Sequence, residues 1–256
     1  MHHSDRKLGE VPIHCAQACS CSTAMRSEMI DPRDEALQRA CPVLAAPLFG
    51  VLPAMENGQR VIVAGNGVFL QVKRDWLDCV ERLGGIDAAM PLPYGKMTPS
   101  VRLTFGTIPI ALLDAFIAAG RAGLPNEIAG GLIYSPQRTT LRLAIYESLH
   151  STAHGIEYRM PPLDRHESIA VDLHTHGVLP AFWSGTDDVD DRSVKVAGVF
   201  GNLDRERPSA AFRLVLNGMY RPLAHPWQAA AQPVESDESW PTLEASGFSI
   251  GEAWII

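Results

Sequence analysis

The stretch VDLHTHGVLPAFWSGTDD, residues 171–188, contains side chains that can bind a metal ion. His174 and His176 stand one residue apart at the end of an apolar run, and Gly177 and Pro180 allow the chain to turn after them. In a β-strand, alternate side chains share a face. We therefore expect the two imidazoles on one surface, about 7 Å apart at Cα, where both rings can approach one ion.

A third ligand must come from elsewhere, because a catalytic zinc needs three protein ligands and an open fourth position. The segment beyond the histidines supplies a serine and four nearby aspartates: Ser184, Asp187, Asp188, Asp190 and Asp191. The pattern H-x-H, seven residues, S-x-x-D selects Ser184 and Asp187. By composition alone, this pattern should arise on the order of once in a thousand such chains. Asp187 can also act simply as the N-cap of a short helix over DDVDD, and the two roles are compatible.

One helix and five strands are expected to position these residues. Apolar residues recur at helical spacing within residues 108–125, and Gly123 and Pro125 should end that helix. Strand-like patterns cover 127–135, 139–151, 166–176, 194–203 and 210–223. In the third of these, Ile169, Val171, Leu173 and Thr175 should face the core, opposite the histidines. An α/β (or α+β) domain is therefore predicted over residues 100–225.

A small β-rich module is expected before that domain, over residues 31–98. Two β-branched runs flank Gly65-Asn66-Gly67, which predicts a hairpin, whereas residues 75–85 have the pattern of a short amphipathic helix. The G-x-G in the hairpin is not a dinucleotide-binding loop, because no helix followed by an acidic strand residue can be read downstream. The Pro/Gly/Ser-rich residues 90–100 are the expected boundary.

The two ends of the chain lack such patterns. Residues 1–30 are expected to form a disordered tail, and residues 226–256 a C-terminal extension over the domain surface. Three cysteines, Cys15, Cys19 and Cys21, lie beside His14, but their spacing matches no common zinc motif.

Composition excludes several classes of function. Among 256 residues, 46% are hydrophobic and 20% charged, as in ordinary globular proteins, and the net charge of -7 argues against nucleic-acid binding. No apolar run approaches the roughly 20 residues that span a bilayer, so no membrane partner is expected. The N-terminus lacks a secretory apolar region, and five cysteines, an odd number, fit a reducing compartment. We therefore expect a cytoplasmic protein.

The histidine motif resembles a known signature. His174, His176, Ser184 and Asp187 look like the H-x-H…S-x-x-D half of the JAMM/JAB (MPN+) zinc metalloprotease family. That family also has an upstream glutamate, where a helix passes into a strand. The segment LPNEIAGGL, residues 124–132, resembles the P-x-E-x-x-G-x-L form seen in bacterial members, and Glu127 is the matching position.

The resemblance implies a role for each residue. His174, His176 and Asp187 would be zinc ligands, Glu127 the general acid/base, and Ser184 the hydrogen-bond donor to the oxyanion. The resemblance covers about residues 105–225, and it implies a JAB/MPN-like, cytidine-deaminase-like mixed sheet flanked by helices. Family members cleave isopeptide or peptide bonds next to ubiquitin-like modifiers, or process small substrates.

Several alternatives stay open at the level of sequence. Glu147, Glu157 and Glu167 lie closer to the histidines than Glu127 does, but only Glu127 has the helix-to-strand context. Asp172 shares the histidine face and is either a partner that orients an imidazole or a solvated strand residue.

Two departures from the family pattern bear on the substrate. Gly177 stands where many members have proline, and no long insertions flank Asp187. The second departure argues against specificity for true ubiquitin.

The whole chain is also similar to the protein A family of the bacterial PRTRC cassette. That resemblance implies a ubiquitin-like protein as substrate and a ThiF-like partner. The predicted function is thus a zinc-dependent isopeptidase or peptidase. The alternatives are a non-catalytic scaffold in a multi-protein complex and a zinc hydrolase that acts on a small amide metabolite.

Overall fold

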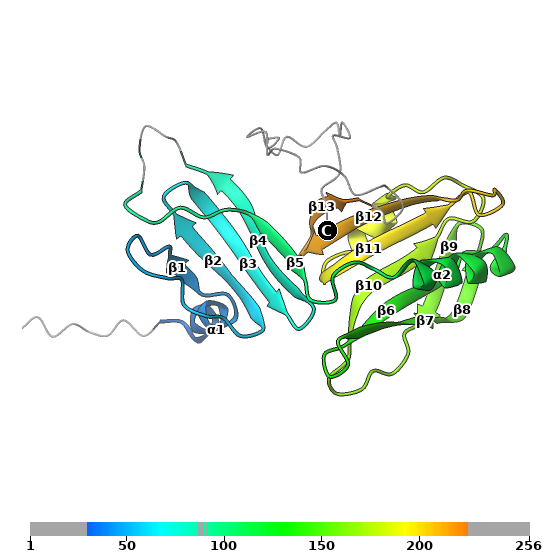
Figure 1. Cartoon of the computed structure of the whole chain (residues 1–256), viewed down its shortest axis with the longest axis horizontal. Coiled ribbons are helices and arrows are strands. Elements are labelled where there is room, and N and C mark those ends of the chain that lie inside the picture. Colours follow the sequence, from blue (N-terminus) through cyan, green and yellow to red (C-terminus); the bar gives the residue numbers. More distant parts are fainter. Residues whose placement is uncertain (1–29, 87–89, 91, 225–256) are drawn as a thin grey trace, which may run out of the picture.

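Two large β-sheets packed against each other form the body of the described protein, and a two-stranded sheet accompanies them (Figure 1). The computed structural model describes residues 30–86, 90 and 92–224. Residues 1–29 of the expected tail at 1–30, with the cysteine cluster, and the expected C-terminal extension at 226–256 lie outside the described residues. Within the described part, no helix has the length and apolar character needed to cross a membrane.

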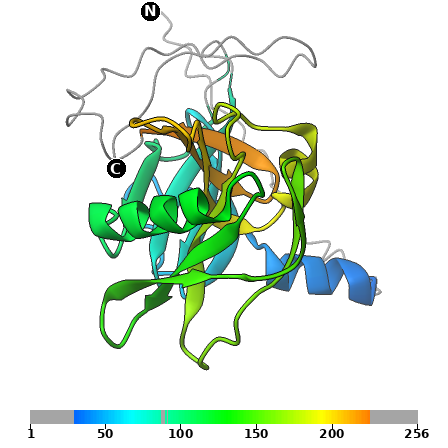
Figure 2. The ribbon, with the colours of Figure 1, turned by 90° about the vertical axis from the view of Figure 1, so that its right-hand side faces the viewer.

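The first sheet comes from the N-terminal module and has the order β1-β2-β3-β4-β5. It follows the helix α1 (Pro32–Ala40), which has no buried residue and projects from the body of the molecule (Figure 2). Its strands are β1 (Val43–Ala45), β2 (Gly58–Ala64), β3 (Gly67–Arg74), β4 (Leu77–Gly85) and β5 (Ser100–Leu103). The predicted hairpin is confirmed, because β2 and β3 pair antiparallel across the two-residue turn Gly65–Asn66.

The helix predicted over residues 75–85 is wrong, since this segment forms the strand β4. It pairs with β3 on one side and β5 on the other, so that its backbone groups are satisfied across the sheet. Leu77 and Cys79, two residues apart, are both fully buried on one face. Sheet pairing and burial therefore override a short helical spacing, as tertiary context commonly does with weak local propensity.

The second sheet has the order β13-β12-β11-β10-β6-β7. Its strands are β6 (Ala129–Ser135), β7 (Thr140–Ile145), β10 (Ser168–Thr175), β11 (Val194–Gly201), β12 (Ser209–Leu216) and β13 (Met219–Leu223). The predicted helix is confirmed as α2 (Ile110–Gly123), and a short α3 (Gly185–Asp190) follows β10. Only β10 and β11 pair in parallel in this sheet.

Two of the predicted strands each divide in two. The segment 139–151 breaks at Tyr146 into β7 and β8 (Glu147–Thr152), and β8 pairs with β9 (Gly155–Arg159) in a separate hairpin. The segment 210–223 folds back as β12 and β13 around Asn217 and Gly218, whose φ angles of 55° and 88° form a left-handed turn. Asn-Gly suits this conformation because both residues tolerate positive φ.

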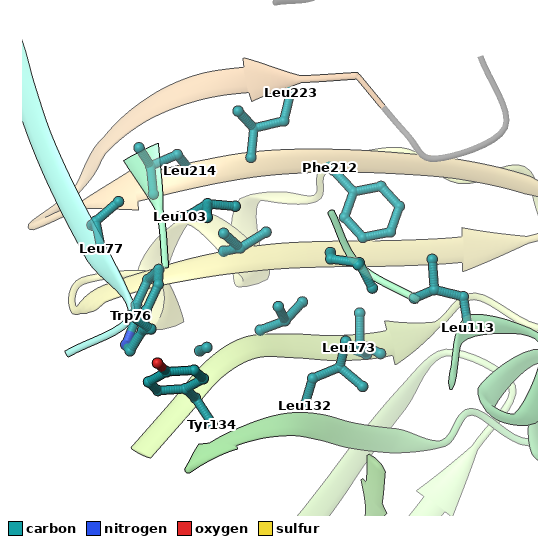
Figure 3. Packing of buried hydrophobic residues seen from close by; sticks show 14 of the residues in the cluster. Trp76, Leu77, Leu103, Leu113, Leu132, Tyr134, Leu173, Phe212, Leu214 and Leu223 are labelled. Atoms are coloured by element: carbon teal, nitrogen blue, oxygen red, sulfur yellow. The ribbon is translucent and has the colours of Figure 1, made fainter. Parts of the chain in front are cut away.

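One hydrophobic core joins the two sheets. Trp76, in the turn between β3 and β4, lies with Leu77 and Leu103 of the first sheet against Tyr134 and Leu214 of the second (Figure 3). Phe105 links them further, with its ring centroid 6.5 Å from that of Trp76 and 6.1 Å from that of Tyr134.

The same face of the second sheet also receives α2. Leu113 and Phe116 of the helix belong to this core, together with Leu173 of β10. The opposite face of the sheet is therefore left for the site.

We predict that the two sheets unfold together. Trp76→Ala should lower the free energy of unfolding by about 3–5 kcal/mol, because it removes a large buried side chain from the shared core. Hydrogen exchange followed by mass spectrometry should show lost protection in β12 as well as β4. Leu83→Ala, at a 39% exposed position on β4, is the matched control and should have a much smaller effect. Unchanged protection of β12 in Trp76→Ala would contradict the prediction.

Candidate metal centre

The end of β10 brings two imidazoles and a carboxylate together. The Nε2 atoms of His174 and His176 are 3.1 Å apart. Asp187 Oδ1 lies 3.2 Å from His174 Nε2, and Asp187 Oδ2 lies 3.9 Å from His176 Nε2. A set of ligand atoms, one from each of the three residues, lies within 4.8 Å of one another.

The strand register explains how the histidines reach the site. Along β10, Val171, Leu173 and Thr175 are buried, and Asp172 and His174 lie between them on the other face, as the sequence predicts. Upstream, a bulge between Ile169 and Val171 interrupts the alternation, so Ala170 also joins the core.

His176 is one residue beyond β10. Its backbone N–H donates to the carbonyl of Phe200 at 2.7 Å, which holds the strand end against β11.

This donor set fits zinc. Two ligands held at about 2.0–2.1 Å from a tetrahedral zinc lie about 3.3 Å from each other, close to the separations between His174, His176 and Asp187. Burial lowers the pKa of both histidines, although the Asp187 charge acts in the other direction. A lowered pKa favours neutral imidazole, which is the form that binds a metal. Two nitrogens and one oxygen are a donor set typical of zinc sites.

Ser184 and Asp187 form a reciprocal capping box at the start of α3. Ser184 is the N-cap and Asp187 the third helical residue, so Asp187 is not itself the N-cap. Asp187 Oδ2 accepts hydrogen bonds from the backbone N–H and the hydroxyl of Ser184, both at 2.7 Å. Burial acts to raise the pKa of Asp187, but the charge of His174 and these hydrogen bonds lower it on balance. The Ser184 hydroxyl therefore orients the Asp187 carboxylate, and in this conformation its proton is already donated.

Glu127 lies two residues before β6, the antiparallel neighbour of the histidine strand β10. His174 pairs with Ala129, and the backbone N–H of Thr175 donates to the carbonyl of Ile128 at 3.0 Å. Continuing this antiparallel register puts Glu127 opposite His176, and opposite residues in a sheet share a face. The backbone of Glu127 is fixed by its N–H, which donates to the carbonyl of Thr152 at 2.8 Å.

The carboxyl of Glu127 has a pKa near neutral pH. Its residue is only 8% exposed. Burial, followed by the negative charge of Asp187, raises its pKa to about 7. A group with such a pKa can both accept and donate a proton at neutral pH.

The other glutamates have different partners. Glu147 pairs with Arg159 across the exposed β8–β9 hairpin, and Glu167 pairs with Arg142. Glu157 is exposed on β9. Of the four glutamates considered, Glu127 is the one that the β6–β10 register directs toward the end of the histidine strand, and the charge of Asp187 acts on its carboxyl.

Asp172 does not hydrogen-bond to either imidazole among the described residues. Its carboxylate accepts from Lys195 Nζ at 2.6 Å and from the Tyr146 hydroxyl at 3.3 Å. It is also no solvated strand residue, because it is half-buried.

Gly177 has a φ angle of 56°, which proline cannot adopt because its ring fixes φ near -65°. The loop after His176 therefore excludes proline at this position and favours glycine.

Two aromatic side chains flank the histidines, and the sequence motif did not single them out. The ring of Phe182 packs edge-on against His176 at 4.5 Å between centroids, and Trp183 against His174 at 6.2 Å. The signal available in the sequence is their position, directly before Ser184.

Comparison with known families matches two segments of the chain. Residues 31–104 match a family described as a domain of unknown function, DUF2016. Residues 109–215 match the family described as prokaryotic homologs of the JAB domain. This second segment is a prokaryotic JAB-type domain, so the resemblance to JAB domains and the predicted α+β fold class are confirmed.

Among solved structures, the chain is similar to the solution structure of protein DSY2949 from Desulfitobacterium hafniense. The two are 14% identical, with a TM-score of 0.35, over 44% of this chain and 85% of that chain. None of the curated proteins compared with the chain matches it.

The raised pKa of Glu127 predicts a pH-dependent stability in metal-free protein. Its ordinary pKa of 4.5 becomes about 7 on folding, so the folded state binds the extra proton and stability falls as pH rises through this interval. Glu127→Gln removes this penalty. Relative to wild type, the variant should gain about 1–3 kcal/mol in unfolding free energy between about pH 4.5 and pH 8.

Urea denaturation at both pH values, with a chelator present, measures this gain. In an Asp187→Asn background the gain should shrink but persist, because burial is the larger cause of the raised pKa. A gain that is the same at both pH values would contradict the assignment.

Proposed function

We propose that this chain, whose residues 109–215 form a prokaryotic JAB-type domain, is a zinc-dependent metallopeptidase or isopeptidase. Its substrate would be a ubiquitin-like or otherwise peptide-tailed protein, cleaved at an amide bond. The observation that supports this most directly is the meeting of His174, His176 and Asp187 beside the Glu127 carboxyl, whose pKa is about 7. The JAB family in general includes zinc metalloisopeptidases.

The residues would divide the chemistry as follows. His174, His176 and Asp187 would hold zinc, which when bound supplies a Lewis acid and lowers the pKa of a water toward about 7. Glu127 would take a proton on its carboxylate from the attacking water and deliver it to the nitrogen of the leaving amine. Ser184 would hold Asp187 in place in the resting state. It would then turn its hydroxyl toward the developing oxyanion.

The surroundings of the site support a polypeptide substrate. Several large apolar side chains in the segment 177–190, which follows the histidines, are exposed: Val178, Leu179, Phe182 and Val189, at 49%, 40%, 47% and 60%. Such a surface suits apolar side chains of an extended segment better than a small polar metabolite. A ubiquitin-like protein and a ThiF-like partner, as the resemblance to PRTRC protein A implies, are part of this proposal.

We predict that purified protein contains about one zinc per chain and that His174→Ala and Asp187→Ala lose it, because each removes a ligand. Glu127→Gln should keep the zinc and lose cleavage by about 10²–10⁴-fold, because only the proton acceptor is removed. Metal analysis and cleavage of ubiquitin-like fusion proteins with glycine-ending tails measure the two effects. Glu157→Gln, on the exposed strand β9, is the matched control and should cleave normally.

The alternatives have distinct outcomes in the same experiment. Cleavage of small amides but of no protein conjugate would favour a metabolite hydrolase. Tight binding to a partner protein with neither zinc nor cleavage would favour a scaffold. If Glu127→Gln cleaved as well as wild type, Glu127 would not be the base.

A further inference from the structure

The helix α3, which carries Asp187, has no apolar anchor. It spans only Gly185–Asp190, and none of its residues is buried. A helix of this length is unstable alone in water, and helices in proteins usually gain their stability by packing an apolar face. Some other interaction must therefore keep Asp187 at 3.2 Å from His174.

Arg213 of β12 makes three hydrogen bonds to α3 and its C-cap. It is only 4% exposed. Its Nη1 donates to Asp188 Oδ1 at 2.6 Å, and its Nε and Nη2 both donate to Asp191 Oδ2, at 3.1 and 2.7 Å. Asp188 follows Asp187 directly, and Asp191 is the C-cap of α3. One guanidinium thus holds the helix at its middle and at its C-terminal end.

The same guanidinium is enclosed between two aromatic rings. Its central carbon lies 3.9 Å from the ring centre of Trp183 and 4.0 Å from that of Tyr220. Trp183 in turn packs edge-on against His174, and the Tyr220 hydroxyl donates to the carbonyl of Asp188 at 2.8 Å. The contacts of Arg213 therefore reach His174 through one ring and the α3 backbone through the other.

Lys195 of β11 connects α3 to the histidine strand. Its Nζ lies 2.6 Å from Asp172 Oδ2 and 2.7 Å from Asp191 Oδ1. Asp172 is two residues before His174 on the same face of β10. Lys195 thus bridges the strand that carries one ligand and the end of the helix that carries another.

All of these residues share one face of the second sheet. Asp172 pairs with Ala197, and Ala197 pairs with Arg213, so the three side chains point to the same side. Arg221, by contrast, pairs with Leu214, the neighbour of Arg213, and therefore lies on the opposite face. There it forms an ion pair with Glu81 of the first sheet at 2.9 Å.

We propose that Arg213, assisted by Lys195, is a positioning residue that sets the metal affinity of the centre. It fixes Asp187 relative to His174 by holding Asp188, Asp191 and Trp183. The inference rests on the proposed function in that the centre binds zinc. Outer groups that orient ligands typically contribute 10–100-fold to metal affinity, so a loss of about this size is expected when Arg213 is removed.

The test compares zinc dissociation constants of full-length variants, measured by competition with a chromophoric chelator. Arg213→Met keeps much of the length of the side chain but removes its donors, and should raise the Kd about 10–100-fold. Arg213→Lys keeps the charge without the planar fork and should give a smaller increase. Lys195→Met should also weaken binding.

Arg221→Met is the matched control, since it breaks an ion pair on the opposite face of the same sheet. It should change stability but leave the Kd within about twofold, because Arg221 faces the other side of the sheet and contacts none of the ligands in the contacts above.

A second readout separates positioning from general destabilisation. In protein saturated with cobalt, the visible spectrum reports the ligand geometry, and Arg213→Met should change it, whereas Arg221→Met should not. Asp188→Asn, whose side chain is 49% exposed, is the milder variant to use if Arg213→Met does not fold. It should raise the Kd in the same direction.

The outcomes separate this proposal from the proposed function. The positioning role is wrong if Arg213→Met binds zinc as tightly as wild type and its cobalt spectrum is unchanged. Where Arg213→Met does not fold, the same result for Asp188→Asn decides. This holds whether or not wild type cleaves conjugates. If wild type binds zinc and these variants bind it more weakly, the role stands even when no peptide bond is cleaved. If wild type binds no zinc, both proposals fail.

Discussion

The pairing of β10 on both of its sides is the constraint on which the site depends. His174 lies opposite Ala129 of the antiparallel neighbour β6 and opposite Val199 of the parallel neighbour β11. The first pairing brings Glu127 alongside His176, because it lies two residues before Ala129. The pairing with β11 brings Lys195, which lies on that strand, to Asp172 of β10. A slip of one residue in either register would turn these side chains to the other face of the sheet.

The second sheet separates two kinds of stabilisation onto its two faces. One face packs apolar residues against α2 and against Trp76 and Leu77 of the N-terminal module, and this shared core fixes the backbone. The other face holds α3 by charge-assisted hydrogen bonds from Arg213 and Lys195. Such bonds are directional, and an apolar contact is not. The face that must hold Asp187 at a defined distance from His174 thus uses the interaction that specifies geometry.

Local spacing in the sequence was enough to predict part of this arrangement. The H-x-H pair and the face of β10 follow from strand periodicity, and the S-x-x-D spacing reflects a capping box within one turn of helix. Glu127 came only from resemblance, because its approach depends on sheet register. Arg213 could not be found, since it contacts Asp191 across 22 residues with no periodic signal. The β4 strand was missed for the same reason: its pairing partners decide its conformation.

The charges around the site also explain why the segment after Ser184 is so acidic. Read alone, DDVDD resembles a solvated run, yet two of its aspartates bind buried or half-buried cations. The groups in contact there are Asp172, Asp188, Asp191, Lys195 and Arg213. Three carboxylates against two cations leave one negative charge, and Asp187 adds a second. The neighbouring histidines do not offset it, because their lowered pKa values favour the neutral imidazole. Two uncompensated negative charges are unfavourable in a half-buried site, because they repel each other and are poorly solvated. A divalent cation held by the histidines and Asp187 would balance both.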